Sequence, residues 1–325
     1  MLAALAAAAA LAAGTNSYAP QTLVTNSSDA SLVNGWGLSA GPTTPWWVSD
    51  NGTDKSTLYN GAGAKQALTV TVAGGPTGTV FNGDATAFAG GRFLFANEAG
   101  QLLGWAPGAT AATVRADLSA QGAIFKGLTL LNGRLYATDF HNGKVLVFDK
   151  SFAPVQVPGG FADKDVPKGY APFGIQALNG SIFVTYAPQD AQKKDELDQP
   201  GRGVVAEFTP DGVLVGNVAK KGGKNAPPNA PWGLALAPQN FGVFSGDLLV
   251  GNFGNGRISA YAQRNGKWVY KGQLRKGDGT IVVIDGLWAI AFGNGSAAGP
   301  ATSLYWAAGP NDEAAGSFGV VTATG

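Results

Sequence analysis

The segment Trp36-Gly37-Leu38 is the first of six short stretches built on one plan, in which a bulky or polar residue precedes a small residue and an apolar run. The other five copies are Asp84-Ala85-Thr86, Lys126-Gly127-Leu128, Phe173-Gly174-Ile175, Trp232-Gly233-Leu234 and Trp288-Ala289-Ile290. Successive copies lie about 42 to 59 residues apart, which is the period of a four-stranded propeller blade with variable loops. The repeat therefore predicts an all-β fold, a six-bladed β-propeller.

Further short apolar segments with the length of strands follow each copy. The second strands are expected at residues 46–51, 92–98, 134–140, 181–187, 247–253 and 303–309. The last unit ends after a third strand at 316–321, whereas the segment 18–27 (YAPQTLVTNS) has no partner at the other end of the chain. Pairing these two ends would remove an exposed sheet edge. We therefore expect residues 18–325 to form six four-stranded blades, with an N-terminal strand closing the ring.

The composition agrees with this fold and excludes several classes of function. The 325 residues are 45% hydrophobic and include 49 glycines and 18 prolines, as a turn-rich all-β chain with a large core requires. The formal net charge of +1 leaves no basic field for nucleic acid, and no stretch after residue 17 is apolar enough to cross a bilayer. The absence of cysteine excludes disulfides and thiolate metal sites.

The N-terminal residues 1–17 differ from the rest of the chain. They contain the alanine-rich run MLAALAAAAALAAG, which has the length and composition of the apolar part of an export signal but lacks the basic residues that usually precede it. We expect a secreted or periplasmic protein. The alternative is an alanine-rich helix or a disordered arm.

Aromatic residues at the starts of the inner strands predict a ligand site at one mouth of the central channel. An indole ring can stack on a sugar ring and offers one N–H donor, so the expected ligand is small and polar or carbohydrate-like, or another extracellular protein. The alternative is that these rings only pack between blades. The candidate ligand-binding residues are Trp36, Phe173, Trp232, Trp288, Asn252 and Tyr186.

Acidic and amide side chains near the same strand ends allow a calcium site. A hard cation prefers six to eight oxygen ligands, and the candidate ligands are Asp84, Glu98, Asp139, Asp285 and Asn82. The alternative is that these groups accept hydrogen bonds from turn N–H groups, as Asp and Asn commonly do after a strand.

The sequence does not decide whether the protein is an enzyme. His141 is the only histidine, which excludes multi-histidine metal centres. Glu98 or Asp84 could serve as a general acid or base, and His141 is a further catalytic candidate. Two long loops, 188–202 and 219–231, should crown the same mouth, either as a solvated charged rim or as a lid.

Several long strings resemble an uncharacterised family of secreted bacterial β-propellers. They are VNGWGLSAGPTTPWWVSDNGT (33–53), YAPFGIQALNGSIFVTYAPQD (170–190), APQNFGVFSGDLLVGNFGNGRISAY (237–261), DGLWAIAFGNG (285–295) and LYWAAGPNDEAAGSFG (304–319). The resemblance implies a six-bladed propeller and export, but no activity.

More distantly, the blades are similar to NHL repeats and to the gluconolactonase group of lactonases, which hold a divalent cation with Glu, Asn and Asp. Asn82-Gly83 and Asp285-Gly286 lie near comparable positions. Two functions therefore remain open: a secreted binding protein that uses the channel mouth, or a metal-assisted hydrolase or lactonase at the same place.

Overall fold

The computed structural model describes residues 14–222 and 227–325. Most of the predicted export segment 1–17 lies outside these residues, so the structure does not test it. The described chain consists of strands and five short 3₁₀-helices and contains no α-helix. The 3₁₀-helices are η1 (Asn51–Thr53), η2 (Phe88–Gly90), η3 (Ser119–Gln121), η4 (Gly242–Phe244) and η5 (Phe253–Asn255). No helix within these ranges is long and apolar enough to cross a membrane.

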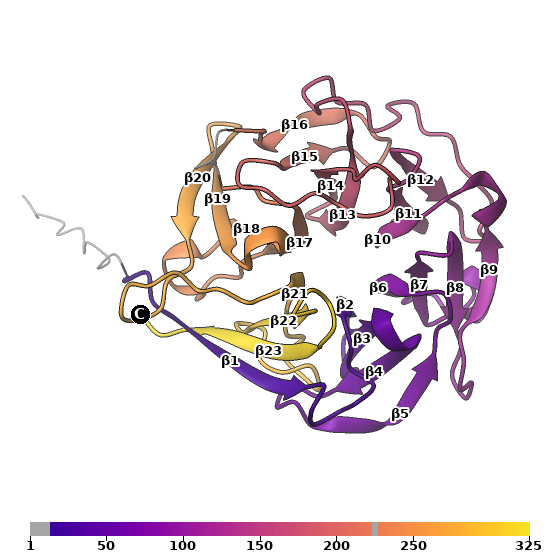
Figure 1. Ribbon diagram of the computed structural model, residues 1–325, viewed down its shortest axis with the longest axis horizontal. Helices are drawn as coiled ribbons and strands as arrows, with labels where there is room; N and C mark the ends of the chain where they lie inside the picture. The colour runs from indigo at the N-terminus through magenta and orange to yellow at the C-terminus, as the bar shows by residue number, and fades with distance from the viewer. Residues whose placement is uncertain (1–13, 223–226) are drawn as a thin grey trace, which may run out of the picture.

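Six antiparallel sheets stand around a central axis as the blades of a propeller, which confirms the predicted fold (Figure 1). Blade 1 contains β2 (Gly35–Ser39), β3 (Trp46–Asp50), β4 (Lys55–Tyr59) and β5 (Lys65–Thr71). Blade 2 contains β6 (Pro76–Phe81), β7 (Phe93–Asn97), β8 (Gln101–Trp105) and β9 (Thr113–Asp117). Blade 3 contains β10 (Phe125–Leu131), β11 (Arg134–Asp139) and β12 (Lys144–Phe148).

The remaining three blades complete the ring. Blade 4 contains β13 (Tyr170–Leu178), β14 (Ser181–Pro188), β15 (Val204–Phe208) and β16 (Leu214–Ala219). Blade 5 contains β17 (Pro231–Leu236), β18 (Leu248–Asn252), β19 (Ile258–Arg264) and β20 (Lys267–Gln273). Blade 6 contains β21 (Leu287–Phe292), β22 (Leu304–Ala308), β23 (Ser317–Ala323) and β1 (Tyr18–Thr25).

The ring is closed by the N-terminal strand, as the sequence predicts. Strand β1 pairs antiparallel with β23 in a register that runs from Tyr18 opposite Ala323 to Thr25 opposite Ser317. The buried Tyr18 hydroxyl also donates to the Phe241 carbonyl at 2.9 Å, which ties the closing strand to blade 5. Strand β1 is the outermost strand of blade 6, so both ends of the described chain are paired within the same sheet.

The fourth strand of blade 3, which the four-stranded plan places at residues 153–158, forms only partly. Its pairing is reduced to an isolated bridge between Phe148 and Pro154 and a hydrogen bond from the Val155 N–H to the Val147 carbonyl at 2.7 Å. The segment APVQVP contains Pro154 and Pro158, and proline cannot donate to a sheet ladder. Pro154 still takes part in the bridge, whereas Pro158 has no N–H to donate at the end of the segment.

One of the six predicted opening copies is wrong. The inner strand of blade 2 is β6, so its opening triplet is Thr77-Gly78-Thr79, and Asp84-Ala85-Thr86 follows the far end of that strand. The small central residue has the role that the sequence suggests, because the inner strands approach one another closely. A Cβ built on Gly37 would lie 2.3 Å from the Thr77 carbonyl oxygen, and one on Gly174 would lie 2.1 Å from that of Trp232.

This contact between inner strands predicts a large difference between two glycine substitutions. Gly174→Ala forces a methyl group against backbone that cannot move independently, and we expect it to lower the free energy of unfolding by about 3 kcal/mol or more. Gly216→Ala, in the outer strand β16, meets no atom within 4 Å and should be neutral or slightly stabilising. Urea unfolding of both variants tests this, and equal stabilities would contradict the role assigned to the inner glycines.

Candidate functional site

Aromatic side chains fill the middle of the central channel. The Trp36 and Trp288 rings stack with centroids 3.7 Å apart, Phe253 stacks on Trp288 at 3.9 Å, and Trp232 meets Trp36 and Trp288 edge-on. We call this cluster the aromatic plug; its members are Trp36, Phe140, Phe173, Trp232, Phe253 and Trp288. Trp36, Phe173 and Trp288 are at most 2% exposed. These rings pack against one another. This agrees with the alternative that the aromatic residues serve packing rather than ligand binding.

Lys126 lies buried on one side of the plug, at the start of the inner strand β10. Its side chain is 0% exposed, and its Nζ lies 2.6 Å from Glu98 Oε1 and 3.0 Å from Asp195 Oδ1. The same ammonium sits 4.7 Å from the centre of the Trp36 ring, in cation–π contact. Burial acts to lower the pKa of Lys126, but the negative charges of Glu98, Glu196 and Asp195 outweigh it and raise the pKa, so the side chain stays charged.

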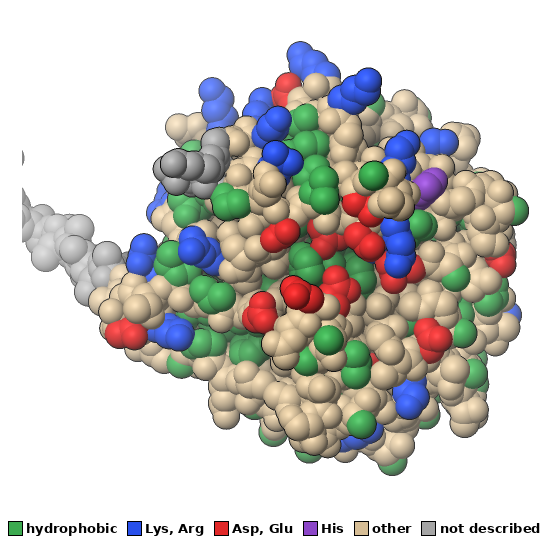
Figure 2. Space-filling view, in the orientation of Figure 1, with side chains coloured by type: hydrophobic (Ala, Val, Ile, Leu, Met, Phe, Trp, Pro, Cys, Tyr) green, Lys and Arg blue, Asp and Glu red, His purple; other side chains and the backbone are tan. Residues whose placement is uncertain are grey.

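Two further carboxyl groups face this ammonium. Burial raises the pKa of Glu196 to about 8, helped by the neighbouring negative charges of Glu313 and Asp195. Burial also raises the pKa of Glu313. We call the set Glu98, Lys126, Asp195, Glu196 and Glu313 the acidic mouth. Figure 2 shows acidic side chains gathered around the centre of the ring on the face turned to the viewer.

A chain of amide hydrogen bonds joins the acidic mouth to the plug. Asn51 donates from Nδ2 to Glu98 Oε2 at 3.1 Å, and Asn34 donates to Asn51 Oδ1 at 3.2 Å and to Glu313 Oε2. The Trp288 indole N–H then donates to Asn34 Oδ1 at 2.8 Å. Carboxylates, amides and one indole are thereby fixed in a single network, so the positions of the mouth groups are set before any ligand arrives.

The loop after β14 completes the acidic mouth. Gln189 and Glu196 form an antiparallel bridge, and the Asp190 N–H donates to the Asp195 carbonyl at 2.8 Å. This small hairpin extends blade 4 and brings Asp195 and Glu196 to Lys126. The sequence predicted this loop at the mouth but offered its charges only as a solvated rim or a lid. The signal that could have found the cluster is Lys126 itself, the one cation at the start of an inner strand.

Among the predicted site residues, Glu98 lies in the acidic mouth, whereas Asp139 and Asn252 hold the backbone. Asp139 Oδ1 accepts from the Ile124 N–H at 3.2 Å, and Asn252 Oδ1 accepts from the Asn229 N–H at 3.0 Å. Each accepted N–H lies just before the inner strand of the same blade, so both side chains clamp an inner strand to its neighbour. This is the hydrogen-bonding alternative, and it explains why Asp and Asn recur at the ends of second strands.

The structure does not bring Asp84 and Asn82 to the mouth. Both follow the carboxyl end of β6, whereas Glu98 lies beside Gly75, just before that strand begins, so the strand length separates them. Hydrogen bonds from Lys150 and Thr86 hold the pKa of Asp84 well below its usual range. Asn82 donates to the Gly91 carbonyl at 2.7 Å. Their predicted place near Glu98 is wrong because the opening copy of blade 2 was assigned to residues beyond its inner strand.

The other predicted residues lie apart from Lys126 and its carboxyl partners. Asp285 accepts from the Asn311 N–H at 3.1 Å. Tyr186 packs in the core between blades 3 and 4, and burial raises its pKa. The His141 Nδ1 is buried without a hydrogen-bond partner in the described structure. Within residues 14–222 and 227–325, no three His, Cys, Asp or Glu side chains are grouped to hold a metal ion, and calcium binding stays a prediction.

Solved structures with a similar fold are β-propeller proteins. A streptogramin B lyase is 12% identical, with a TM-score of 0.58 over 94% of this chain and 98% of that chain. A luciferin-regenerating enzyme is 15% identical, with a TM-score of 0.57 over 94% and 96% of the two chains. The soluble aldose sugar dehydrogenase of Escherichia coli is 13% identical, with a TM-score of 0.57 over 95% and 100%. At these identities the likeness shows the fold alone.

Curated relatives come from Acanthamoeba polyphaga mimivirus and are named as uncharacterized proteins. One is 28% identical over 285 residues, which cover 81% of this chain and 74% of the relative. Another is 31% identical over 175 residues, but this match covers 53% of this chain and only 32% of the relative's length. No family model matches the chain. The resemblance to secreted bacterial propellers therefore stays a prediction.

The buried ammonium predicts a strong stability effect at the acidic mouth. Lys126→Met leaves Glu98 and Asp195 without their cation, and we expect it to reduce the free energy of unfolding by about 3 to 5 kcal/mol. The matched control is Lys150→Met, which breaks an exposed pair with Asp84 and should cost less than about 1 kcal/mol. Denaturant unfolding compares the two, and a similar small loss in both variants would show that Lys126 is not essential to the mouth.

Proposed function

We propose that the protein is a binding protein whose acidic mouth takes a small polar ligand carrying an aliphatic ammonium group. The observation that carries this proposal is the excess of carboxyl groups over cations at the mouth. Four carboxyl groups face the single buried ammonium of Lys126, and the second cation nearby, Lys194, lies 4.0 Å from Asp195 at the exposed rim. Glu196 and Glu313 form no salt bridge within the described structure, which leaves them for an incoming cation.

Access to the mouth comes from its outer members. The Asp195 side chain is 54% exposed and that of Glu98 is 18% exposed, whereas Lys126 lies fully covered beneath them. A ligand would therefore meet the carboxyl groups first. Hydroxyl or amide groups on the same ligand could use the free hydrogen-bonding capacity of the carboxylates. Export, predicted from residues 1–17, belongs to this proposal, because a secreted or periplasmic protein would meet its ligand outside the cytoplasm.

Proton release should accompany binding. Because its pKa is about 8, the Glu196 carboxyl holds a proton at neutral pH and is neutral. A cation binds more strongly to the deprotonated form, so its arrival expels that proton. Affinity for a cation therefore rises as pH rises toward the pKa of Glu196, and it levels off above that pH as long as the ligand amine stays charged.

The alternative, a metal-assisted hydrolase or lactonase, would use the same carboxyl groups. The raised pKa of Glu196 suits a general acid, which favours this function. The Lys126 ammonium already occupies the position between Glu98 and Asp195, so a divalent ion, like a ligand ammonium, would have to use the other carboxyl groups. Calcium binding is therefore measured separately in the experiment below.

Calorimetric titration with putrescine, its uncharged isostere 1,4-butanediol, and calcium tests the proposal. We expect putrescine to bind and butanediol not to bind. Putrescine affinity should rise by up to about tenfold per pH unit between about pH 6 and pH 8 and then level off. The Glu196→Gln variant removes the titrating group, so its affinity should vary little with pH.

Two results would overturn the proposal. Equal binding of putrescine and butanediol would mean that charge is not recognised. Tight calcium binding without any amine binding would favour the metal-assisted alternative.

A further inference from the structure

A cavity opens at the end of the central channel away from the acidic mouth, on the face where the inner strands end. It has a volume of about 320 Å³ and is lined by all six inner strands, β2, β6, β10, β13, β17 and β21. The third residue of every opening triplet lines it: Leu38, Thr79, Leu128, Ile175, Leu234 and Ile290. We call this cavity the inner chamber. Its volume lies at the lower end of the range for sites that bind small organic molecules.

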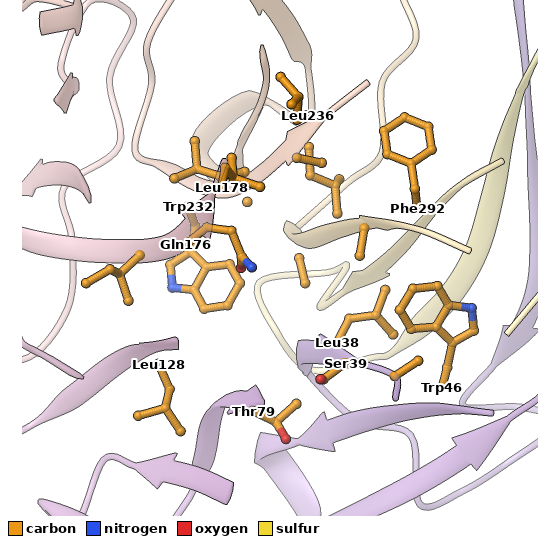
Figure 3. Close-up of a pocket in the computed structure, with 18 of the residues that line it drawn as sticks. Leu38, Ser39, Trp46, Thr79, Leu128, Gln176, Leu178, Trp232, Leu236 and Phe292 are labelled. Atoms are coloured by element: carbon orange, nitrogen blue, oxygen red, sulfur yellow. The ribbon is translucent and has the colours of Figure 1, made fainter. Parts of the chain in front are cut away.

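The inner chamber differs in chemistry from the acidic mouth. None of the residues that line it is charged. Three aromatic rings, those of Trp46, Trp232 and Phe292, stand around it, with Trp232 on one side and Trp46 and Phe292 on the other (Figure 3). A charged molecule would have to lose its hydration without gaining an ion pair here, whereas a flat apolar molecule could pack against these rings.

Most polar groups of the chamber are already used. Thr79 donates to the Leu94 carbonyl, and Ser39 Oγ accepts from the Phe81 N–H. The Asn294 carboxamide donates to the Gly41 and Thr44 carbonyls and accepts from the N–H groups of Ser296 and Ala298.

One polar side chain of the chamber remains for a ligand. The Gln176 carboxamide has no hydrogen-bond partner among the described residues, and it lies next to the Trp232 ring in Figure 3. The Trp232 indole N–H also has no partner in the described structure, but it is buried and does not open into the chamber. A ligand with a carbonyl or amide group could pair with the Gln176 carboxamide while its ring fills the apolar space.

We infer that the inner chamber is a binding site for an uncharged, flat, largely apolar molecule that carries a carbonyl or amide group. The aromatic plug separates it from the acidic mouth, because Trp36 contacts Lys126 on one side and Trp232, which lines the chamber, on the other. The inference goes beyond the proposed function and does not rest on it.

Titration with 1-naphthamide and its charged isostere 1-naphthoate, followed by calorimetry and by tryptophan fluorescence, tests the inference. We expect naphthamide to bind and to change the fluorescence of the protein, and naphthoate to bind at least tenfold more weakly. Gln176→Leu removes the polar partner and should weaken naphthamide binding about fivefold to tenfold. Gln66→Leu, on the outer strand β5, is the matched control and should leave binding unchanged.

A filling variant provides a second, independent test. Ala291→Phe places a ring in the chamber and should abolish naphthamide binding while putrescine binding at the acidic mouth persists. If this variant does not fold, the Gln176→Leu comparison still decides. Equal binding of amide and carboxylate, no binding of either, or unchanged binding in Gln176→Leu would each overturn the inference.

Discussion

The close approach of the six inner strands around the axis is the constraint on which the rest of the structure depends. A small residue at the centre of each opening triplet lets one backbone lie against the next, as the 2.1 Å gap between a Cβ on Gly174 and the Trp232 carbonyl shows. The first and third residues of the triplet then lie toward opposite ends of the channel. The first residues, such as Trp36 and Lys126, form the plug and the mouth, and the third residues line the inner chamber.

Lys126 occupies a position that three of the other inner strands fill with tryptophan. An ammonium buried at this depth is stable only when its charge is compensated, because leaving it unpaired in a poorly hydrated site costs several kcal/mol. Blade 2 supplies Glu98 and the loop of blade 4 supplies Asp195. The Lys126 ammonium is therefore compensated by neighbours from both sides. These carboxylates come together around it only when the ring has assembled.

Much of the fold could be predicted from the sequence because it depends on local pattern. The triplets, the strand-length apolar segments and the unpaired segment near Tyr18 specify six blades and their closure. The pattern failed in blade 2, where Thr77-Gly78-Thr79 lacks a bulky first residue and Asp84-Ala85-Thr86 imitates one. It also overstated the fourth strand of blade 3, where the pairing is limited to one bridge between Phe148 and Pro154.

The candidate site was less predictable because it depends on contacts between distant segments. Trp36 and Trp288 were assigned to the right region, but nothing in the sequence shows that their faces stack on each other. The hairpin bridge between Gln189 and Glu196 sets the place of Asp195, and such a bridge leaves no periodic signal in a charged loop. Asp139 and Asn252 were recognisable as strand-end residues, but only their partners show that they hold backbone.

The order of chemistry along the channel follows from these contacts. Charged groups lie where water can still reach Asp195 and Glu98, aromatic rings lie next, and the uncharged chamber lies last. The rings exclude water from one side of Lys126, which lowers the local dielectric constant and strengthens its attraction to Glu98. The same rings keep that charge away from the chamber, where an unpaired ion would be costly. The aromatic plug thus separates a charged region from an uncharged region within one narrow channel.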